Sequence, residues 1–326
     1  MMMIIISIFL LTMLVITAMA IVHASNLFVA VMLSGIFSLL LAANFLLLDA
    51  ADVALTEAAV GAGISTVLFL GALALTAERE TAGTANRGLG LVVVTVTTLV
   101  IVYALNDQVR FADPTAPVHQ HVAPWYLEKT PQLIDVPNVV TAVLASFRGY
   151  DTLGEVFVVF TAGIGVLFLF SGGRNKSRLP SRDHLPGLRH YLIPRMVGRM
   201  LIPFILLFGL YVQFHGDFGP GGGFQAGALF AASIILYALL EGESRAMEVL
   251  QTRILTALMA GGALLYSVVG VAGMLMGGNF LDYSVLMSDP VAGQHIGILV
   301  IEFGVGMSVT GVLLSIFLAF ATRGRS

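Results

Sequence analysis

The chain has 326 residues, of which 58% are hydrophobic and only 11% are charged, and its mean hydropathy is +0.95. Such a composition excludes a water-soluble surface and is typical of a polytopic membrane protein. The absence of cysteine excludes disulfides, thiolate nucleophiles and cysteine-bound metals, whereas the net charge of -3 does not discriminate among function classes.

Nine apolar windows are long enough to cross a bilayer as helices. The first has no preceding Lys or Arg and is longer than the core of a signal peptide, so we expect it to remain in the mature chain. The predicted fold class is an all-α polytopic membrane protein with about nine transmembrane helices. The windows are residues 3–22, 27–48, 54–77, 88–106, 152–170, 197–214, 224–241, 252–275 and 296–320.

Basic residues predict the orientation of these spans. The connector at 171–199 holds seven basic residues against the single acid Asp183, so the positive-inside rule assigns it to the cytoplasm. The acid-bearing loops between spans then fall outside. We therefore expect an external N-terminus and a cytoplasmic C-terminus. Three further pairs of arginines fall on the cytoplasmic side: Arg79/Arg87, Arg245/Arg253 and Arg323/Arg325.

The same connector is the predicted boundary between two parts of the chain, near residue 185. Five spans precede it, and four spans with short loops follow. The outer loop at 107–137 contains five prolines. It is long enough to hold a short helix or to cover a neighbouring subunit.

Acids at the start of the third span are candidates for an ion path, because an ionisable residue at membrane depth costs roughly 2.5 to 3.5 kcal/mol. Asp52 and Glu57 both lie there, and Gly61 and Gly63 follow within two turns. These glycines favour a loosened helix or a π-bulge, which is common at functional sites. Helix capping is the competing explanation for Asp52, but it does not require a second acid at Glu57.

Two further groups of acids lie at the edge of spans or within them. Asp151 and Glu155 share a face of the fifth span, and Arg148 is within reach of Asp151. Capping again competes for Asp151 but not for Glu155. Glu302 is embedded in the apolar last span, where His295 or a neighbouring subunit is its expected partner.

Several classes of site are not supported by the sequence. The two lysines, Lys129 and Lys176, fall in predicted loops, and no Lys or Arg is assigned to the middle of a span. A complete proton channel carried by this chain alone is therefore not expected. No phosphate-binding glycine loop or nucleophile elbow is present, and the loop pair His119 and His121 is typical of solvated histidines rather than of a metal site. We expect no enzyme activity, metal or cofactor.

A polar, glycine-dense break, HGDFGPGGGFQAG at 215–227, separates the sixth and seventh spans. Pro220 is followed by three glycines and cannot continue a helix, so the segment lies at a membrane surface or folds back into protein. A tight connector is the simplest explanation. The run resembles the glycine-rich motif of MnhB-type subunits of multisubunit Mrp cation/proton antiporters, with Asp217 where that motif has a second histidine.

Two other strings extend the resemblance. ADVALTEAAVGAGISTVLFLGAL at 51–73 is similar to MbhD modules, and NVVTAVLASFRGYDTLGEVFVVFTAGIGVLFLF at 138–170 is similar to MbhE modules. The family places these modules in membrane-bound hydrogenases and near the end of the large A-type Mrp subunit. The division that we expect is 1–84 MbhD-like, 85–175 MbhE-like, 176–194 a basic linker and 195–326 MnhB-like.

The resemblance implies a fused subunit of a Na+/H+ antiporter in the bacterial cell membrane, similar to the part of complex I that joins its antiporter-like subunits. The expected partners are large antiporter-like A- and D-type subunits, a C-type subunit, small E-, F- and G-type subunits, membrane lipid, Na+ and H+, but not nucleic acid. The antiporter-like front part of the A-type subunit would be a separate polypeptide. By this resemblance, Glu57 corresponds to the MbhD acid, Asp151 and Glu155 correspond to the MbhE acids, and structural or subunit-contact roles fall to Arg148, His215, Asp217, Pro220, Gly221, Gly222 and Gly223.

Two alternatives remain open at this point. One is the equivalent membrane subunit of a hydrogenase or related respiratory complex. The other is a scaffold that joins antiporter subunits and conducts no ions, which would tolerate Glu57→Gln and Glu155→Gln.

Overall fold

The computed structural model describes residues 2–76, 78–80, 87–110, 113–171 and 191–322. Within these ranges, nine helices are long and apolar enough to cross a membrane, which confirms the predicted fold class. Their bounds agree with the predicted windows to within a few residues at most ends. They are α1 Met2–His23, α2 Leu27–Leu47, the third span at Ala51–Leu73, α5 Arg87–Asn106, α8 Gly149–Ser171, α9 Leu192–His215, α10 Gly223–Glu241, α12 Thr252–Leu275 and α13 Pro290–Thr322.

The third span is not a uniform α-helix. It consists of α3 Ala51–Thr56, the π-helix η1 Glu57–Ile64 and α4 Ser65–Leu73. The π-helical turns contain both Gly61 and Gly63, as the sequence predicts. A π-helix turns more slowly than an α-helix, so it changes the direction in which Glu57 and the residues after it face.

Shorter helices fill the connections. The long loop between α5 and α8 contains η2 Val118–Val122 and α6 Ala123–Leu133, so it holds a short helix, the first of the two possibilities given above. Lys129 lies in this helix rather than in an irregular loop. The chain then continues through α7 Val139–Ala142 and η3 Val143–Phe147 into α8. The two remaining short helices are α11 Glu243–Val249 and η5 Tyr283–Val285.

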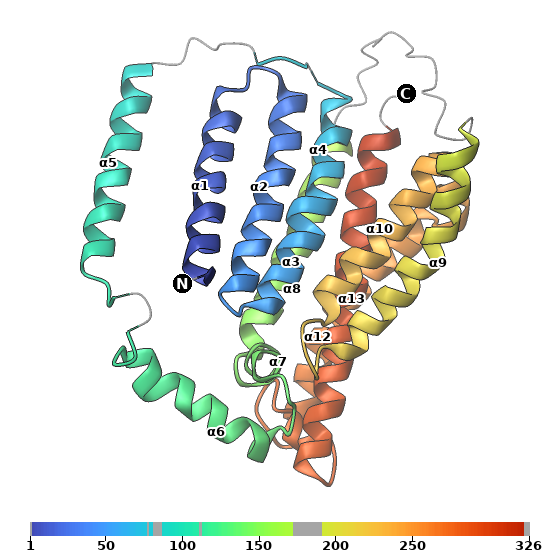
Figure 1. Ribbon diagram of the computed structural model, residues 1–326. Coiled ribbons are helices and arrows are strands. Elements are labelled where there is room, and N and C mark those ends of the chain that lie inside the picture. Colours follow the sequence, from blue (N-terminus) through green and yellow to red (C-terminus); the bar gives the residue numbers. More distant parts are fainter. Residues whose placement is uncertain (1, 77, 81–86, 111–112, 172–190, 323–326) are drawn as a thin grey trace.

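The last helix, α13, is the centre of the bundle. It packs against α8, α10 and α12, and its 33 residues span about 50 Å at 1.5 Å per residue. A hydrocarbon core is about 30 Å thick, so α13 extends beyond it. This explains why the helix begins six residues before the predicted window, where hydropathy no longer marks it. Figure 1 shows α12 and α13 reaching below the other spans.

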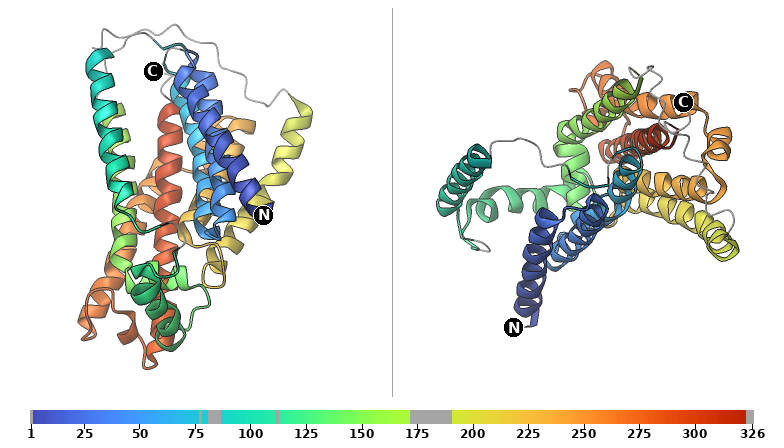
Figure 2. Two further views of the ribbon diagram at one scale, coloured as in Figure 1. Left: turned by 60° about the vertical axis from the view of Figure 1, so that its left-hand side comes forward. Right: turned by 90° about the horizontal axis from the view of Figure 1, so that it is seen from above.

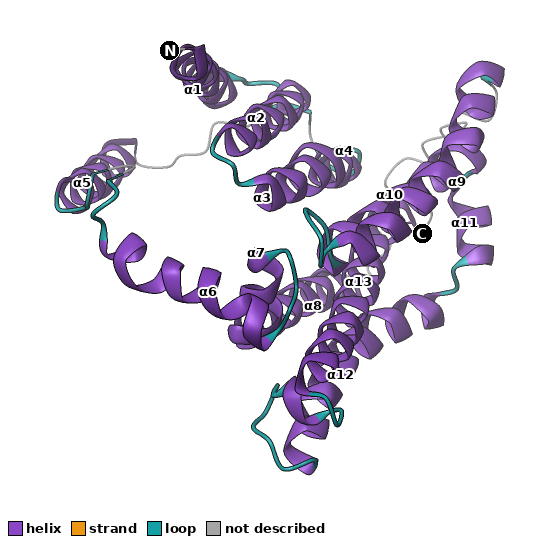
Figure 3. Ribbon diagram, turned by 60° about the horizontal axis from the view of Figure 1, so that its bottom comes forward, coloured by secondary structure: helices purple, strands orange, loops and turns teal. Residues whose placement is uncertain are grey.

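The first three spans form a row beside this bundle, whereas α5 stands apart. Figures 2 and 3 show α5 separated from the rest and joined to α7 through α6. Every residue of 88–106 is exposed. The row of α1, α2 and the third span is connected to the bundle through η1, whose buried Ile64 packs with Ala231 of α10 and Phe317 of α13.

A second buried cluster holds the start of α8 against α12 and α13. The Tyr266 hydroxyl donates to the Gly149 carbonyl at 2.9 Å, and the Tyr283 hydroxyl donates to the Ala145 carbonyl at 3.1 Å. Both rings are fully buried. Burial also raises the pKa of Tyr283, which lies outside the spans, so this phenol remains a neutral donor. These bonds fix the segment from η3 into α8 next to the glycine-rich loop.

Candidate functional site: a carboxylate-lined cavity

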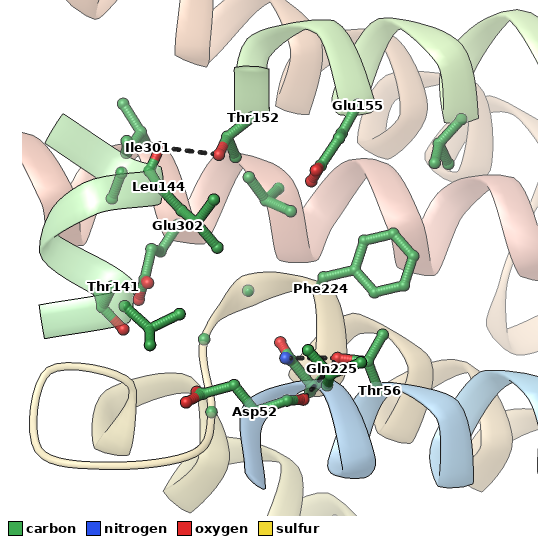
Figure 4. A pocket seen from close by; sticks show the side chains of 18 of the residues that line it. Asp52, Thr56, Thr141, Leu144, Thr152, Glu155, Phe224, Gln225, Ile301 and Glu302 are labelled. Carbon is green, nitrogen blue, oxygen red and sulfur yellow. Dashed lines mark hydrogen bonds between the residues drawn. The ribbon is translucent and has the colours of Figure 1, made fainter. Parts of the chain in front are cut away.

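One cavity of about 580 Å3 lies where α3, α7, α8, α10 and α13 meet. Its walls are mostly apolar, but three carboxylates line it: Asp52, Glu155 and Glu302. Figure 4 shows that they enter from three different helices. Each of these acids is more than 100 residues from the other two in the sequence, so only the tertiary fold brings them together.

The glycine-rich loop wraps closely around Glu302. A Cβ atom added at Gly222 would lie 3.0 Å from Oε1 of Glu302, and one added at Gly216 would lie 3.2 Å from Oε2. A Cβ atom at Gly223 would overlap the Glu302 carbonyl. Gly222 also has φ +108°, a conformation that other residues rarely adopt. The break at 215–227 is therefore a connector that folds back onto α13, and its glycines let the backbone approach this acid.

Asp52 belongs to a network centred on Asn138. The Asn138 side-chain nitrogen donates to Asp52 at 3.3 Å, to the Gly216 carbonyl at 3.2 Å and to the Gly219 carbonyl at 3.0 Å. Its side-chain oxygen caps α7. The capping alternative for Asp52 is wrong: Ala50 is the N-cap of α3, and Asp52 lies in the first turn, where its carboxylate faces Asn138 and the cavity.

A hydrogen bond between an amide and a hydroxyl joins α3 to α10 in the wall of the cavity. The buried Gln225 side chain donates to the Thr56 hydroxyl at 2.8 Å, and Thr56 donates in turn to the Asp52 carbonyl at 2.9 Å. Both side chains line the cavity. The sequence reasoning did not single out Gln225, Thr56 or Asn138. The one available signal was Gln225 itself, a polar amide among the small and apolar residues at the start of α10.

The two acids of α8 separate. Glu155 lines the cavity, whereas Asp151 forms an ion pair with Arg148 at 2.5 Å and is not among the lining residues. The Arg148 contact confirms the predicted reach, and both partners are about half exposed. Capping is also wrong for Asp151, which is the third residue of α8. Glu155 is itself exposed, so the cavity is open on the α8 side.

Glu57 lies in a different place from the other acids. Its carboxylate is packed against Gly61 and is near the Ser38 hydroxyl of α2, since a Cβ atom at Gly61 would meet both groups. It does not line the cavity. Glu57 therefore faces α2 within the row of the first three spans, whereas Asp52, five residues earlier in the same span, faces the cavity.

The glycine-rich loop next to the cavity contains a buried acid with an oxygen that has no partner among the described residues. Within the part of the chain that the structure describes, Oδ1 of Asp217 is buried without a hydrogen-bond partner. This burial raises the pKa of Asp217, and the positive charge of His295 opposes the shift. The expected ion pair between His295 and Glu302 does not form among the described residues. His215 stacks on Tyr211 with ring centres 4.7 Å apart.

Arg195 and Arg199 lie near the start of α9, at the end of a span rather than in its middle. α9 begins at Leu192, five residues before the predicted window, so that Arg195 joins Arg199 inside the helix. Both contact Glu241 at the end of α10. The hydropathy pattern left Arg195 outside the predicted window because it cannot include a carboxylate that lies 46 residues further along the chain. Lys176 lies outside the described residues.

Comparison with known proteins identifies the family. Three family models match successive parts of the chain: the D-type subunit of MBH (MbhD) at 12–78, the E-type subunit of MBH (MbhE) at 91–178 and a domain related to the MnhB subunit of Na+/H+ antiporter at 193–315. The putative antiporter subunit mnhB2 of Staphylococcus aureus is 34% identical over 138 residues, which are 41% of this chain and 96% of that protein. The chain belongs to the MnhB family. It carries MbhD- and MbhE-type segments in the same polypeptide, as the resemblance implied.

Two other relatives match longer stretches of this MnhB-family chain. An uncharacterized protein of Methanocaldococcus jannaschii is 32% identical over 174 residues, covering 50% of this chain and 66% of that protein. A probable A/B subunit of a K+/H+ antiporter of Rhizobium meliloti is 28% identical over 228 residues, covering 64% of this chain and 23% of that protein. The chain thus spans about two thirds of the first relative and about a quarter of the second.

Two solved structures are similar to this MnhB-family chain. A chain of the Mrp complex from Dietzia sp. DQ12-45-1b matches with TM-score 0.77 and 26% identity, over 98% of this chain and 35% of that one. A chain of the membrane-bound sulfane sulfur reductase, an archaeal respiratory complex, matches with TM-score 0.52 and 28% identity, over 72% of this chain and 97% of that one.

Proposed function

We propose that this multi-pass protein is a transporter subunit, not an enzyme, of a multisubunit Na+/H+ antiporter in a bacterial cell membrane. The observation that carries the proposal is the convergence of Asp52, Glu155 and Glu302 on one cavity. Carboxylates held at membrane depth are costly and serve ion and proton pathways in membrane proteins. The relatives named as antiporter subunits support the same activity.

The three acids supply the chemistry of exchange. A monovalent cation prefers oxygen ligands, and here carboxylates, the Thr56 hydroxyl and the Gln225 amide border a space that holds an ion with part of its hydration shell. When a proton replaces the cation on Glu302, the site is discharged without leaving an unpaired charge among apolar walls. Competition between H+ and Na+ for the same carboxylates couples their opposite movements.

The open side of the cavity requires a partner. Glu155 is exposed on α8, and a carboxylate does not stably face lipid, so a helix of another subunit covers it in the assembled complex. α5, whose residues 88–106 are all exposed, likewise offers its surface to partner helices. We propose that these partners are the A-, D-, C-, E-, F- and G-type antiporter subunits. The proposal also includes the division of the chain after residues 84, 175 and 194 and a cytoplasmic location of the basic connector. It further includes a contribution of Glu57 and Asp151 to the wider ion path.

The half-saturating Na+ concentration of proton flux tests the proposal. Everted vesicles containing the whole complex would be compared for wild type, Asp52→Asn and Glu302→Gln, with Glu128→Gln, which replaces an exposed acid of α6 outside the cavity, as the control. Loss of one charged ligand costs about 1.5 to 3 kcal/mol, so the half-saturating concentration should rise about tenfold or more. Unchanged values in both cavity variants would support the scaffold alternative. Repeating the titration with K+ distinguishes the cations.

A respiratory complex is the second candidate, because the sulfane sulfur reductase chain shares the fold over most of its own length. In that case proton flux would depend on electron transfer. Cation-driven flux in the absence of any electron donor would exclude it.

A further inference from the structure

A cluster of arginines surrounds Glu241, the last residue of α10. The side chain of Glu241 is only 1% exposed. Arg195 contacts it through Nε at 2.8 Å and Nη2 at 3.0 Å, and Arg199 through Nε at 2.7 Å and Nη2 at 2.6 Å. Arg245 of α11 adds a contact through Nη1 at 3.1 Å. Three cationic side chains from two helices therefore share one carboxylate.

This cluster has excess positive charge. One guanidinium balances Glu241, so the three arginines retain two positive charges. Each guanidinium has five N–H donors, and Glu241 engages only one or two nitrogens of each. The salt bridges that the structure shows for these three arginines all lead to Glu241. The arginine side chains are 27%, 49% and 45% exposed, so their remaining donors are accessible from outside.

The cluster lies where a span meets the membrane surface. Glu241 ends α10, and Arg195 and Arg199 occupy the first two turns of α9. The side chains beside and beyond them on α9 are exposed and apolar, including Met196, Met200 and Phe204. A surface with unsatisfied cationic donors at the membrane boundary and an apolar face below is complementary to a molecule with an anionic head and an acyl tail.

We propose that Arg195, Arg199 and Arg245 bind the phosphate headgroup of an anionic phospholipid whose acyl chain lies along the exposed face of α9. A phosphodiester accepts several guanidinium hydrogen bonds at once and is the resident anion of this environment. The site is independent of antiport, because it is formed at the opposite end of α10 from the cavity. Its role is to anchor α9 to α10 and α11 at the membrane surface.

Lipid titration of the purified whole complex tests the headgroup chemistry. Phosphatidylglycerol should raise the melting temperature in detergent and remain bound in native mass spectra, whereas phosphatidylcholine should do neither. Inorganic phosphate should also fail, since it has no acyl chain. Equal effects of the two lipids, or full stabilisation by phosphate alone, would overturn the proposal.

A matched pair of variants assigns the effect to the cluster. Arg245→Gln leaves Glu241 paired with both arginines of α9 and should weaken phosphatidylglycerol binding about fivefold. Arg253→Gln changes an exposed arginine at the same end of the membrane that does not contact Glu241, and should leave binding unchanged. Equal binding by both variants would refute the assignment.

Photo-crosslinking of the wild-type complex provides a test that requires no variant to fold. A phosphatidylglycerol with a diazirine in its acyl chain should label the α9 peptide containing Met196 and Met200. Absence of this labelling, or crosslinking of these arginines to an acidic segment of another subunit instead, would overturn the proposal in favour of a protein partner.

Discussion

Replacing Gly222 by alanine should separate the conformational role of the glycine-rich loop from its contact with Glu302. Gly222 has φ +108° and ψ −179°, and Gly242 has φ +94° and ψ 149°. Both conformations lie in a region used almost only by glycine, so alanine costs of order 1 to 3 kcal/mol at either position. The two positions differ in their surroundings. An added Cβ atom meets Oε1 of Glu302 at 3.0 Å at Gly222 and has no neighbour within 4 Å at Gly242.

Gly222→Ala and Gly242→Ala should therefore lower the melting temperature of the complex by similar amounts, measured by fluorescence-detected size exclusion after heating. Proton flux per assembled complex should fall in Gly222→Ala alone, because only there is the Glu302 carboxylate displaced. Equal flux per complex in the two variants would refute the reasoning that the loop positions this acid.

Three other substitutions give distinct outcomes. Asn138→Ala removes three donor contacts and a helix cap, and should destabilise the fold by about 2 to 3 kcal/mol in chemical unfolding; a loss below about 1 kcal/mol would argue against the network. Arg148→Gln breaks a half-exposed ion pair and should change stability by less than about 1 kcal/mol. Asp217→Asn should stabilise the complex at pH 7. Burial raises the pKa of Asp217 above its ordinary value of 3.8. The contribution of the unmodified acid to folding stability is therefore fully present below pH 3.8 and is lost as pH rises through the pKa of the folded state. The gain in melting temperature should therefore shrink as pH falls from 7 towards 4, and a gain that grows on acidification would contradict it.

The spans were predictable because the bilayer fixes their length and polarity. The π-helix was predictable because glycines follow Glu57 within two turns. The start of α9 was predicted five residues too late, because the helix continues through Arg195, whose charge Glu241 partly neutralises. The start of α13 was missed because that part of the helix lies beyond the apolar core.

The individual acids were recognisable from the sequence, but their grouping was not. Asp151 and Glu155 are one helical turn apart, yet the first pairs with Arg148 and the second lines the cavity. Asp52 and Glu302 meet because the glycine-rich loop lies between their helices and Asn138 connects it to Asp52. These relations depend on packing between segments far apart in the chain, which periodicity and composition do not encode.

The central claim is that Glu302 and the acids around it carry the exchanged ions. The most direct measurement is Na+-dependent proton flux in everted vesicles for wild type and Glu302→Gln, at equal amounts of assembled complex on a native gel. The account predicts that flux falls about tenfold or more while assembly is retained. Undiminished flux from an intact Glu302→Gln complex would contradict it.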